Sequence, residues 1–241
     1  MKKAFLFFAV MGLISVQSQA QEIVLEKNVE DQYQREKGPN TSFFGQGYVA
    51  FASILNYDES TGAAINPWQS GQFIIGYRYK IKLLPFYSIG FDLGFRMNNY
   101  YLRGDKDNPY DSANPLTFKT GEKRHIFTNN GLGLELYQRI NIGKRGNTLG
   151  NYLDIGIQGQ WNVADVEEIV TNFDNADFVG RERLFNRRLK YVEEFSFGLS
   201  ARIGIDKFVI YGNYRLSDIF KEDYQIPELP RLAVGLQYAF Y

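Results

Sequence analysis

The chain of 241 residues contains no cysteine, which excludes disulfide bonds and thiolate metal sites. Beyond residue 20 it has no run of about 18 consecutive apolar residues, so the sequence predicts no membrane-spanning helix. It also lacks an excess of charge, with 27 basic and 27 acidic residues. Without a basic surplus there is no general electrostatic footprint for nucleic acid, and we expect no nucleic-acid partner.

The first 20 residues have the pattern of a secretory signal peptide. Lys2 and Lys3 precede an apolar run over residues 4–14, and small residues at Ser18 and Ala20 offer a cleavage site. No cysteine follows the run, so a lipid anchor is not expected. We therefore predict a signal peptide at 1–20, cleaved after Ala20, and a polar periplasmic lead-in at 21–42.

Residues 86–102 alternate between two kinds of side chain. Tyr87, Phe91 and Phe95 fall on an apolar, aromatic face, whereas Asp92 and Arg96 fall on a face that is otherwise rich in glycine. Successive side chains of a β-strand point to opposite sides, so this segment is predicted to be a strand with two different environments. In a closed membrane barrel the apolar face looks outward into lipid.

The same alternation recurs along the remaining chain. The predicted strands cover residues 44–57, 70–82, 86–102, 126–142, 152–163, 189–205, 208–217 and 231–241. Short connections alternate with long ones, which lie at 58–69, 102–125, 164–188 and 218–230. This rhythm is typical of outer-membrane barrels, which have short periplasmic turns and long extracellular loops. The predicted fold is all-β: an eight-stranded antiparallel transmembrane β-barrel of OmpA/OmpX-like architecture over 43–241, in the cell outer membrane.

A soluble barrel that binds an apolar ligand is the main alternative architecture. It would have to pack the chain's 20 Phe and 17 Tyr residues, together with its aliphatic residues, largely inside one eight-stranded ring, which leaves only a narrow interior. Glycines such as Gly90, Gly94 and Gly198 also occupy the polar face. Nothing favours glycine on a strand face that is exposed to water, because glycine weakens a strand. Both observations favour the membrane barrel.

The chain resembles small outer-membrane β-barrels of the PorT-like kind from the Bacteroidota. The resemblance lies in the Lys2-Lys3 signal, the eight-strand rhythm and the closing stretches at 214–220 and 230–238. It implies an outer-membrane location, and some members of that family take part in protein secretion and gliding machinery. The chain is accordingly expected to have a structural or interaction role in the envelope, rather than an enzymatic one, with other envelope proteins as partners.

Charged residues on the glycine-rich faces are expected to point into the barrel. They are predicted to form a structural network of ion pairs that fills the lumen, because buried charges must be paired. The predicted members are Arg78, Asp92, Arg96, Glu135, Arg139, Asp154, Glu194, Arg202, Arg215 and Arg231. The functional alternative is a small gated channel, since eight strands leave no room for a wide pore.

Two further features offer chemistry at the extracellular rim. His125 is the only histidine, and with Asp111, Ser112 or Thr128 it would suit a lipid-modifying enzyme. The acidic segment 105–111 lacks the glycine of a calcium loop and is interpreted as a solvated loop, so no metal or other cofactor is predicted.

The loop at 164–188 changes from acidic to basic along its length. At its end, Arg187 and Arg188 are candidates for contact with the phosphates of lipopolysaccharide, because guanidinium groups match phosphate geometry.

Overall fold

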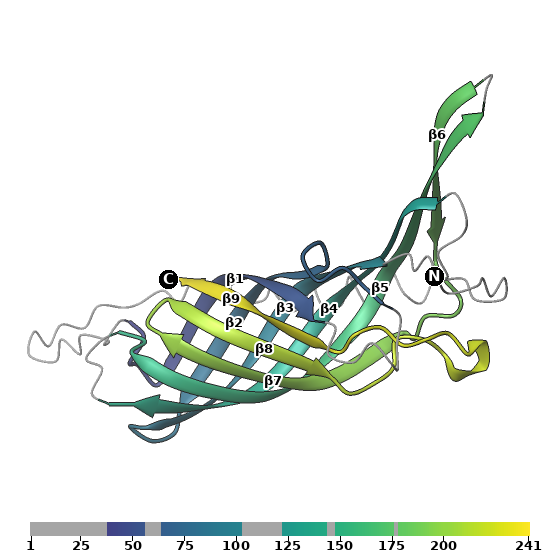
Figure 1. The fold of residues 1–241 in the computed structure, drawn as a ribbon. Coiled ribbons are helices and arrows are strands. Elements are labelled where there is room, and N and C mark those ends of the chain that lie inside the picture. Colours follow the sequence, from purple (N-terminus) through teal and green to yellow (C-terminus); the bar gives the residue numbers. More distant parts are fainter. Residues whose placement is uncertain (1–37, 56–63, 103–121, 144–147, 176–177) are drawn as a thin grey trace, which may run out of the picture. The chain divides into compact units, whose positions relative to one another are not determined.

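The computed structural model describes residues 38–55, 64–102, 122–143, 148–175 and 178–241 (Figure 1). These residues form an all-β fold whose only helical element is a single 3-10 turn at Glu222–Tyr224. No helix in the described part of the chain is long and apolar enough to cross a membrane. The predicted signal peptide at 1–20 and most of the lead-in at 21–42 lie outside the described residues.

Nine strands are present in the described part of the chain. They are β1 (Phe43–Leu55), β2 (Gly71–Lys82), β3 (Tyr87–Leu102), β4 (Glu122–Ile142), β5 (Asn151–Asn175), β6 (Phe178–Arg187), β7 (Phe195–Ile205), β8 (Phe208–Arg215) and β9 (Leu232–Phe240).

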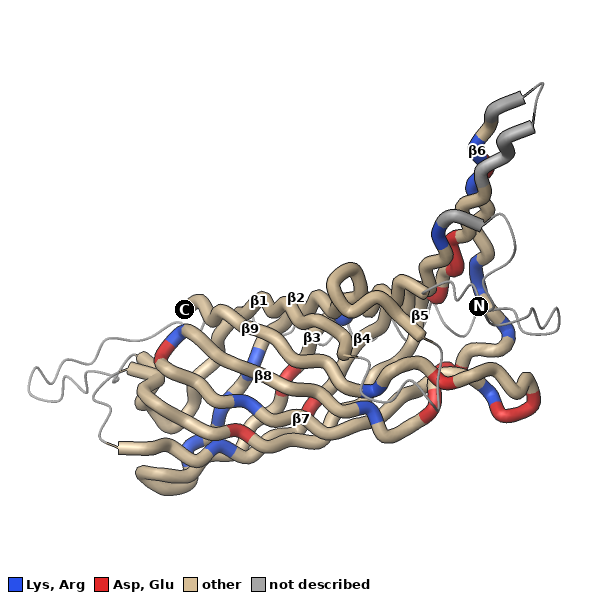
Figure 2. Tube along the Cα trace, in the orientation of Figure 1, with Lys and Arg blue, Asp and Glu red and all other residues tan. Residues whose placement is uncertain are grey.

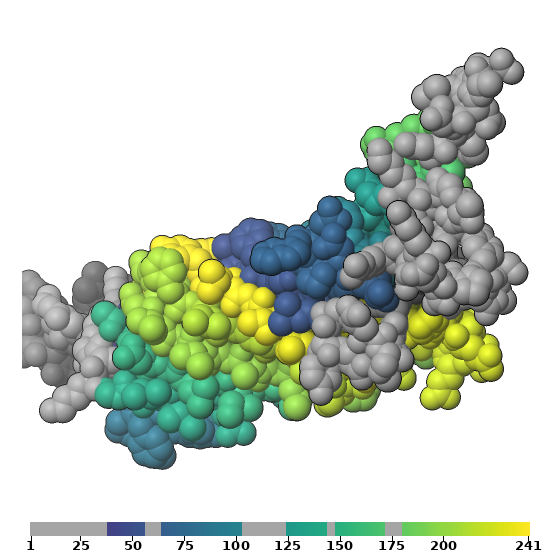
Figure 3. Space-filling model, viewed as in Figure 1, coloured from purple at the N-terminus to yellow at the C-terminus, as the bar shows by residue number. Residues whose placement is uncertain are grey.

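Eight of these strands close into an antiparallel ring, which confirms the predicted number. The order around the ring is β1-β2-β3-β4-β5-β7-β8-β9, and β9 returns to β1 through pairs from Gly47↔Phe240 to Leu55↔Leu232. Figure 3 shows this closure from outside, where the purple β1 lies beside the yellow β9. Closure leaves no strand of the ring with an unpaired edge.

The two ends of the ring differ. At the end named here the turn end, residues 83–86 join β2 to β3, and Asp206 and Lys207 alone join β7 to β8. Asp206 has a positive φ of 53°, as tight hairpin turns commonly require. The opposite end, named the loop end, carries the connections from β1 to β2, β3 to β4 and β8 to β9, together with the outer parts of β4, β5 and β6.

The segment predicted as a loop at 164–188 is instead a hairpin. β5 pairs with β7 as far as Trp161, then continues to Asn175 and pairs with β6, from Val166↔Arg187 to Asn175↔Phe178. The prediction failed because this segment is rich in charge and shows no apolar alternation. Beyond the ring, backbone pairing replaces the packed interior as the source of order. The strand predicted at 189–205 accordingly begins only at Phe195, as β7.

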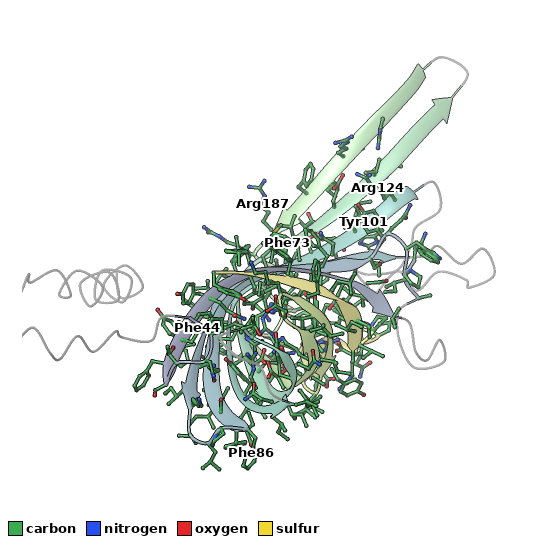
Figure 4. All side chains as sticks on the ribbon, turned by 90° about the vertical axis from the view of Figure 1, so that its left-hand side faces the viewer. Phe44, Phe73, Phe86, Tyr101, Arg124 and Arg187 are labelled. Atoms are coloured by element: carbon green, nitrogen blue, oxygen red, sulfur yellow. The ribbon has the colours of Figure 1, made fainter. Side chains whose placement is uncertain are left out.

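Alternation along each ring strand separates two surfaces. In β7, Phe197, Leu199 and Ile203 are exposed, whereas Ser200 and Arg202 are buried. The turn-end view of Figure 4 shows nitrogen and oxygen atoms gathered inside the ring, and Figure 2 marks charged positions on successive ring strands. The interior is therefore polar and the outer surface apolar, the inverse of a soluble protein core.

Candidate functional site

Seven ionisable side chains from five strands meet inside the ring. None of them exposes more than 2% of its surface. They are Arg78 on β2, Asp92 and Arg96 on β3, Glu135 and Arg139 on β4, Asp154 on β5 and Arg202 on β7. Charges this deeply buried are tolerated only when they are paired and hydrogen-bonded.

Asp154 organises the part of this network closer to the turn end. Its two oxygens accept hydrogen bonds from Nε and Nη2 of Arg139 at 2.7 and 2.8 Å. Nη2 of Arg78 lies 3.0 Å from Asp154 Oδ2. The guanidinium groups also stack on aromatic rings, with Arg139 3.6 Å from the centre of Tyr152 and Arg78 4.0 Å from that of Tyr137. One carboxylate thus serves two cations, and the tyrosine faces supply further stabilisation.

Glu135 and Asp92 form the middle of the network. They are direct cross-strand neighbours, an arrangement that two like charges disfavour. Arg202 offsets this repulsion by a bidentate interaction with Glu135, which also accepts a hydrogen bond from Ser200 at 2.7 Å. Asp92 accepts a hydrogen bond from the hydroxyl of Tyr48 at 2.8 Å and lies 3.2 Å from Nε of Arg78. The cations that pair with the two acids therefore offset the repulsion between their negative charges.

Glycines on the inner face make room for these large side chains. A Cβ atom on Gly133 would lie 2.4 Å from Nε of Arg96, and one on Gly204 would lie 2.1 Å from the ring of Tyr152. Both distances are far below van der Waals contact. The glycine-rich face therefore lets arginine and tyrosine side chains lie across neighbouring strands.

Towards the loop end the charged network gives way to a layer of amides, which sequence reasoning missed. Asn213 donates to Gln72 at 2.8 Å, Gln72 donates to Asn98 at 2.8 Å, and Gln160 donates to Asn129 at 2.7 Å. The alternation in the sequence indicates this layer, since each of these residues occupies an inward position of its strand. The predicted interior network includes charged residues only and therefore omits the amides.

Side chains close the ring at both ends in the described structure. An apolar cluster at the loop end includes Tyr100, Phe127, Val192 and Phe220, all buried. At the turn end, Lys82 donates to the side-chain oxygen of Asn40 at 3.1 Å, and Lys80 donates to the carbonyl of Pro39. The described part of the predicted lead-in, residues 38–42, thus contacts the turn end.

Three of the predicted interior residues lie at the loop-end rim. Arg215 is mostly buried and lies 2.7 Å from Glu228, and Arg231 pairs with Asp218 at a partly exposed position. The interior position predicted for Glu194 is wrong, because this side chain is exposed. It precedes Phe195, the first residue of β7, so the alternation of that strand does not extend to it.

His125 is buried beside the hairpin formed by β5 and β6. Its Nε2 lies 2.8 Å from Glu167 Oε1, and Asn186 donates to the other oxygen of Glu167 at 2.9 Å. Burial raises the pKa of Glu167, but these hydrogen bonds outweigh it and leave the pKa below its ordinary value. The structure thus gives the histidine a carboxylate partner that the sequence had not indicated.

The predicted nucleophile for His125 is not found in the described structure. Thr128 donates to Asn99 at 2.9 Å, and as the third residue after His125 it falls on the opposite face of β4. Asp111 and Ser112, like the loop 105–111, lie outside the described residues. Among the residues that are described, no group of three metal-ligating side chains comes together.

Arg187 and Arg188 are exposed where β6 ends, and Arg188 adopts a positive φ of 57°. Arg181 and Arg183 lie two residues apart on the same face of β6 as Arg187, and both are exposed. The structure therefore places a row of guanidinium groups along the hairpin outside the ring.

No protein-family model matches the chain, and no curated protein matches it in sequence. Its function must therefore be inferred from the fold and from the site geometry.

Proposed function

We propose that the protein is an integral outer-membrane β-barrel with a closed, charge-filled interior and a structural or interaction role in the cell envelope. The observation that carries the proposal is an apolar outer surface on every strand of the ring. One exposed member from each strand, between 48% and 67% exposed, illustrates it: Phe51, Ile75, Leu93, Leu134, Ile157, Phe197, Ile210 and Leu236. An apolar surface that encircles the molecule is unfavourable in water and favourable in lipid.

The two different ends of the ring support an orientation. In outer-membrane barrels short turns face the periplasm and long connections face outward, so the turn end is periplasmic and the hairpin of β5 and β6 is extracellular. This orientation agrees with the predicted signal peptide, cleaved after Ala20, which delivers the chain to the periplasm. The PorT-like resemblance, with its link to secretion and gliding machinery, remains a prediction.

The closed interior favours a structural role over conduction. Each of the three buried carboxylates contacts at least two cations, and the two ends are covered by packed side chains. A solute would have to break several desolvated ion pairs to pass, and each such break is costly. The interaction role therefore falls to the surfaces outside the ring.

The basic hairpin supports lipopolysaccharide as one partner. Arg187 and Arg188 lie at its base, where Arg187 pairs with Val166 just beyond the last β5–β7 pair, and in this orientation that end of the ring faces the outer leaflet. We expect Arg187→Glu/Arg188→Glu to lower the amount of lipopolysaccharide that co-purifies with the protein. Lys207→Glu, at the opposite end, is the control and should leave that amount unchanged. Equal lipid content in all three proteins would contradict the contact.

Leu134 and Leu184 test the membrane proposal as a matched pair, because both side chains are 50% exposed. Leu134 lies on the ring and Leu184 on the hairpin beyond it. Arginine at a lipid-facing position costs about 2–4 kcal/mol at the membrane midplane. In water a surface substitution changes stability by about 0.5 kcal/mol or less.

We therefore expect Leu134→Arg to destabilise the protein in phospholipid vesicles, as measured by urea unfolding, and Leu184→Arg to be neutral. The parent protein should also require detergent to remain in solution. Equal stability of the two variants, or a parent that stays soluble without detergent, would refute membrane insertion.

A further inference from the structure

The charges of the seven-residue network inside the ring do not balance. Four guanidinium groups, those of Arg78, Arg96, Arg139 and Arg202, share three carboxylates, those of Asp92, Glu135 and Asp154. This leaves an excess of one positive charge within the seven-residue network. An uncompensated charge in a low-dielectric interior is strongly unfavourable, so a counter-charge is needed.

The excess is located on Arg96. Its nearest carboxylate is Glu135, 3.6 Å from Nη2, but Glu135 is already held bidentately by Arg202. Nη1 of Arg96 donates to the neutral side-chain oxygen of Gln158. Its Nε and Nη2 make no hydrogen bond within the described structure. Of the four guanidinium groups in the network, that of Arg96 therefore has the weakest interaction with a carboxylate.

Arg96 lines a cavity of about 50 Å³ between the charged network and the loop end. The other polar lining groups include the amides of Gln72, Asn98 and Gln158 and the guanidinium groups of Arg215 and Arg231. None of the described residues that line the cavity is acidic. A buried water needs about 10–15 Å³ by this measure, so the space fits a few waters or one small ion.

We propose that this cavity binds one small monovalent inorganic anion, of the size of chloride, which neutralises Arg96. Arg215 and Arg231 are already paired with Glu228 and Asp218, so the unmatched charge is that of Arg96. A monovalent anion restores neutrality to the network, whereas a divalent one would overcompensate it. The amide layer provides polar groups for the remaining coordination of the ion. The site depends on the ring interior and holds whether or not the ring lies in lipid.

The test is the unfolding midpoint of the detergent-solubilised protein as sodium chloride replaces sodium gluconate at constant ionic strength. Constant ionic strength removes the general effect of charge screening. A ligand that binds only the folded state raises the free energy of unfolding. At concentrations above the dissociation constant, this increase is proportional to the logarithm of the ligand concentration. We expect the midpoint to be insensitive to chloride well below that constant and to rise by a few degrees for each tenfold increase above it.

Two variants locate the effect at Arg96. Arg96→Gln removes the excess charge, and its midpoint should no longer respond to chloride. Gln158→Glu places a carboxylate beside Nη1 of Arg96, so its midpoint in gluconate should rise and its response to chloride should disappear. Gln158→Glu keeps the test decisive if Arg96→Gln does not fold. Lys207→Gln, which removes one positive charge at the turn end, is the control and should respond as the parent does.

Bromide gives a direct readout, because its anomalous scattering in a crystal locates it. We expect a bromide peak beside Arg96 in the parent and none in Gln158→Glu. The proposal is overturned if the midpoint of the parent does not rise with halide concentration, which would mean that water fills the cavity. It is equally overturned if Gln158→Glu keeps the parent's response or if bromide is found only on the protein surface.

Discussion

Asp154 is the residue whose loss should damage the interior most clearly. Asp154→Asn preserves the shape of the side chain but removes the charge that faces Arg139 and Arg78. Arg139 loses a bidentate partner with distances of 2.7 and 2.8 Å, while Arg78 retains Asp92 at 3.2 Å. The variant therefore leaves Arg139 as a buried guanidinium with no carboxylate partner among the residues that the structure describes.

Removal of one member of a buried ion pair costs about 3–5 kcal/mol, because the remaining charge stays desolvated. Asp218 provides the matched control, since Asp218→Asn makes the same chemical change to a pair with Arg231. The side chains of that pair are 48% and 33% exposed, so its contribution is about 0–1 kcal/mol. The two substitutions should therefore differ by roughly 2–5 kcal/mol.

Urea unfolding in phospholipid vesicles, followed by tryptophan fluorescence and circular dichroism, measures both losses. The double variant Arg139→Met/Asp154→Leu removes both charges and should recover most of the stability that Asp154→Asn loses. The reasoning is refuted if Asp154→Asn and Asp218→Asn cost the same, or if the double variant is no more stable than Asp154→Asn.

Three further outcomes are expected. Gly235→Ala should destabilise the ring by about 1–3 kcal/mol, because its Cβ would lie 2.0 Å from the Phe51 carbonyl oxygen. Gly159→Ala is the control and should not destabilise the ring, because no non-adjacent atom would lie nearer than 4.0 Å to its Cβ. Similar unfolding midpoints of the two variants would contradict this. Burial raises the pKa of Asp165, so the charged carboxylate destabilises the folded state. Asp165→Asn should therefore stabilise the protein at neutral pH, and this gain should fade as the pH falls below the raised pKa. A gain in stability that is independent of pH would refute this cause. Purified protein in planar bilayers should show no reproducible single-channel steps, and stable steps would disprove the closed interior.

Alternation alone was sufficient to predict the ring strands to within a few residues at most ends. It also predicted which face of each strand is polar, because a period of two assigns every residue to one side. Arg78, Asp92 and Arg202 were for this reason expected in the interior, where the structure places them. The one error among the charged candidates, Glu194, arose at a strand boundary. Outside the strand, alternation no longer assigns a residue to the inner or the outer face.

The partners within the interior could not be predicted in the same way. Asp154 contacts its cross-strand neighbour Arg139, but it also contacts Arg78, which lies three strands away around the ring. Such contacts depend on the tilt and stagger of the closed sheet, which no single strand reveals. The hairpin of β5 and β6 was missed for a different reason, since strands beyond the ring need no apolar face.

The pairing of β1 with β9 has a consequence for how the chain folds. It joins Gly47 to Phe240, so the contact that completes the ring has nearly the largest sequence separation available. Every other ring contact links strands that are close in sequence or separated only by β6. Hairpins can therefore form early, but closure must wait for the last strand, and contacts of this kind slow folding. A chain that lacked β9 would leave β1 and β8 with open edges, and its expected fate is aggregation rather than a smaller barrel.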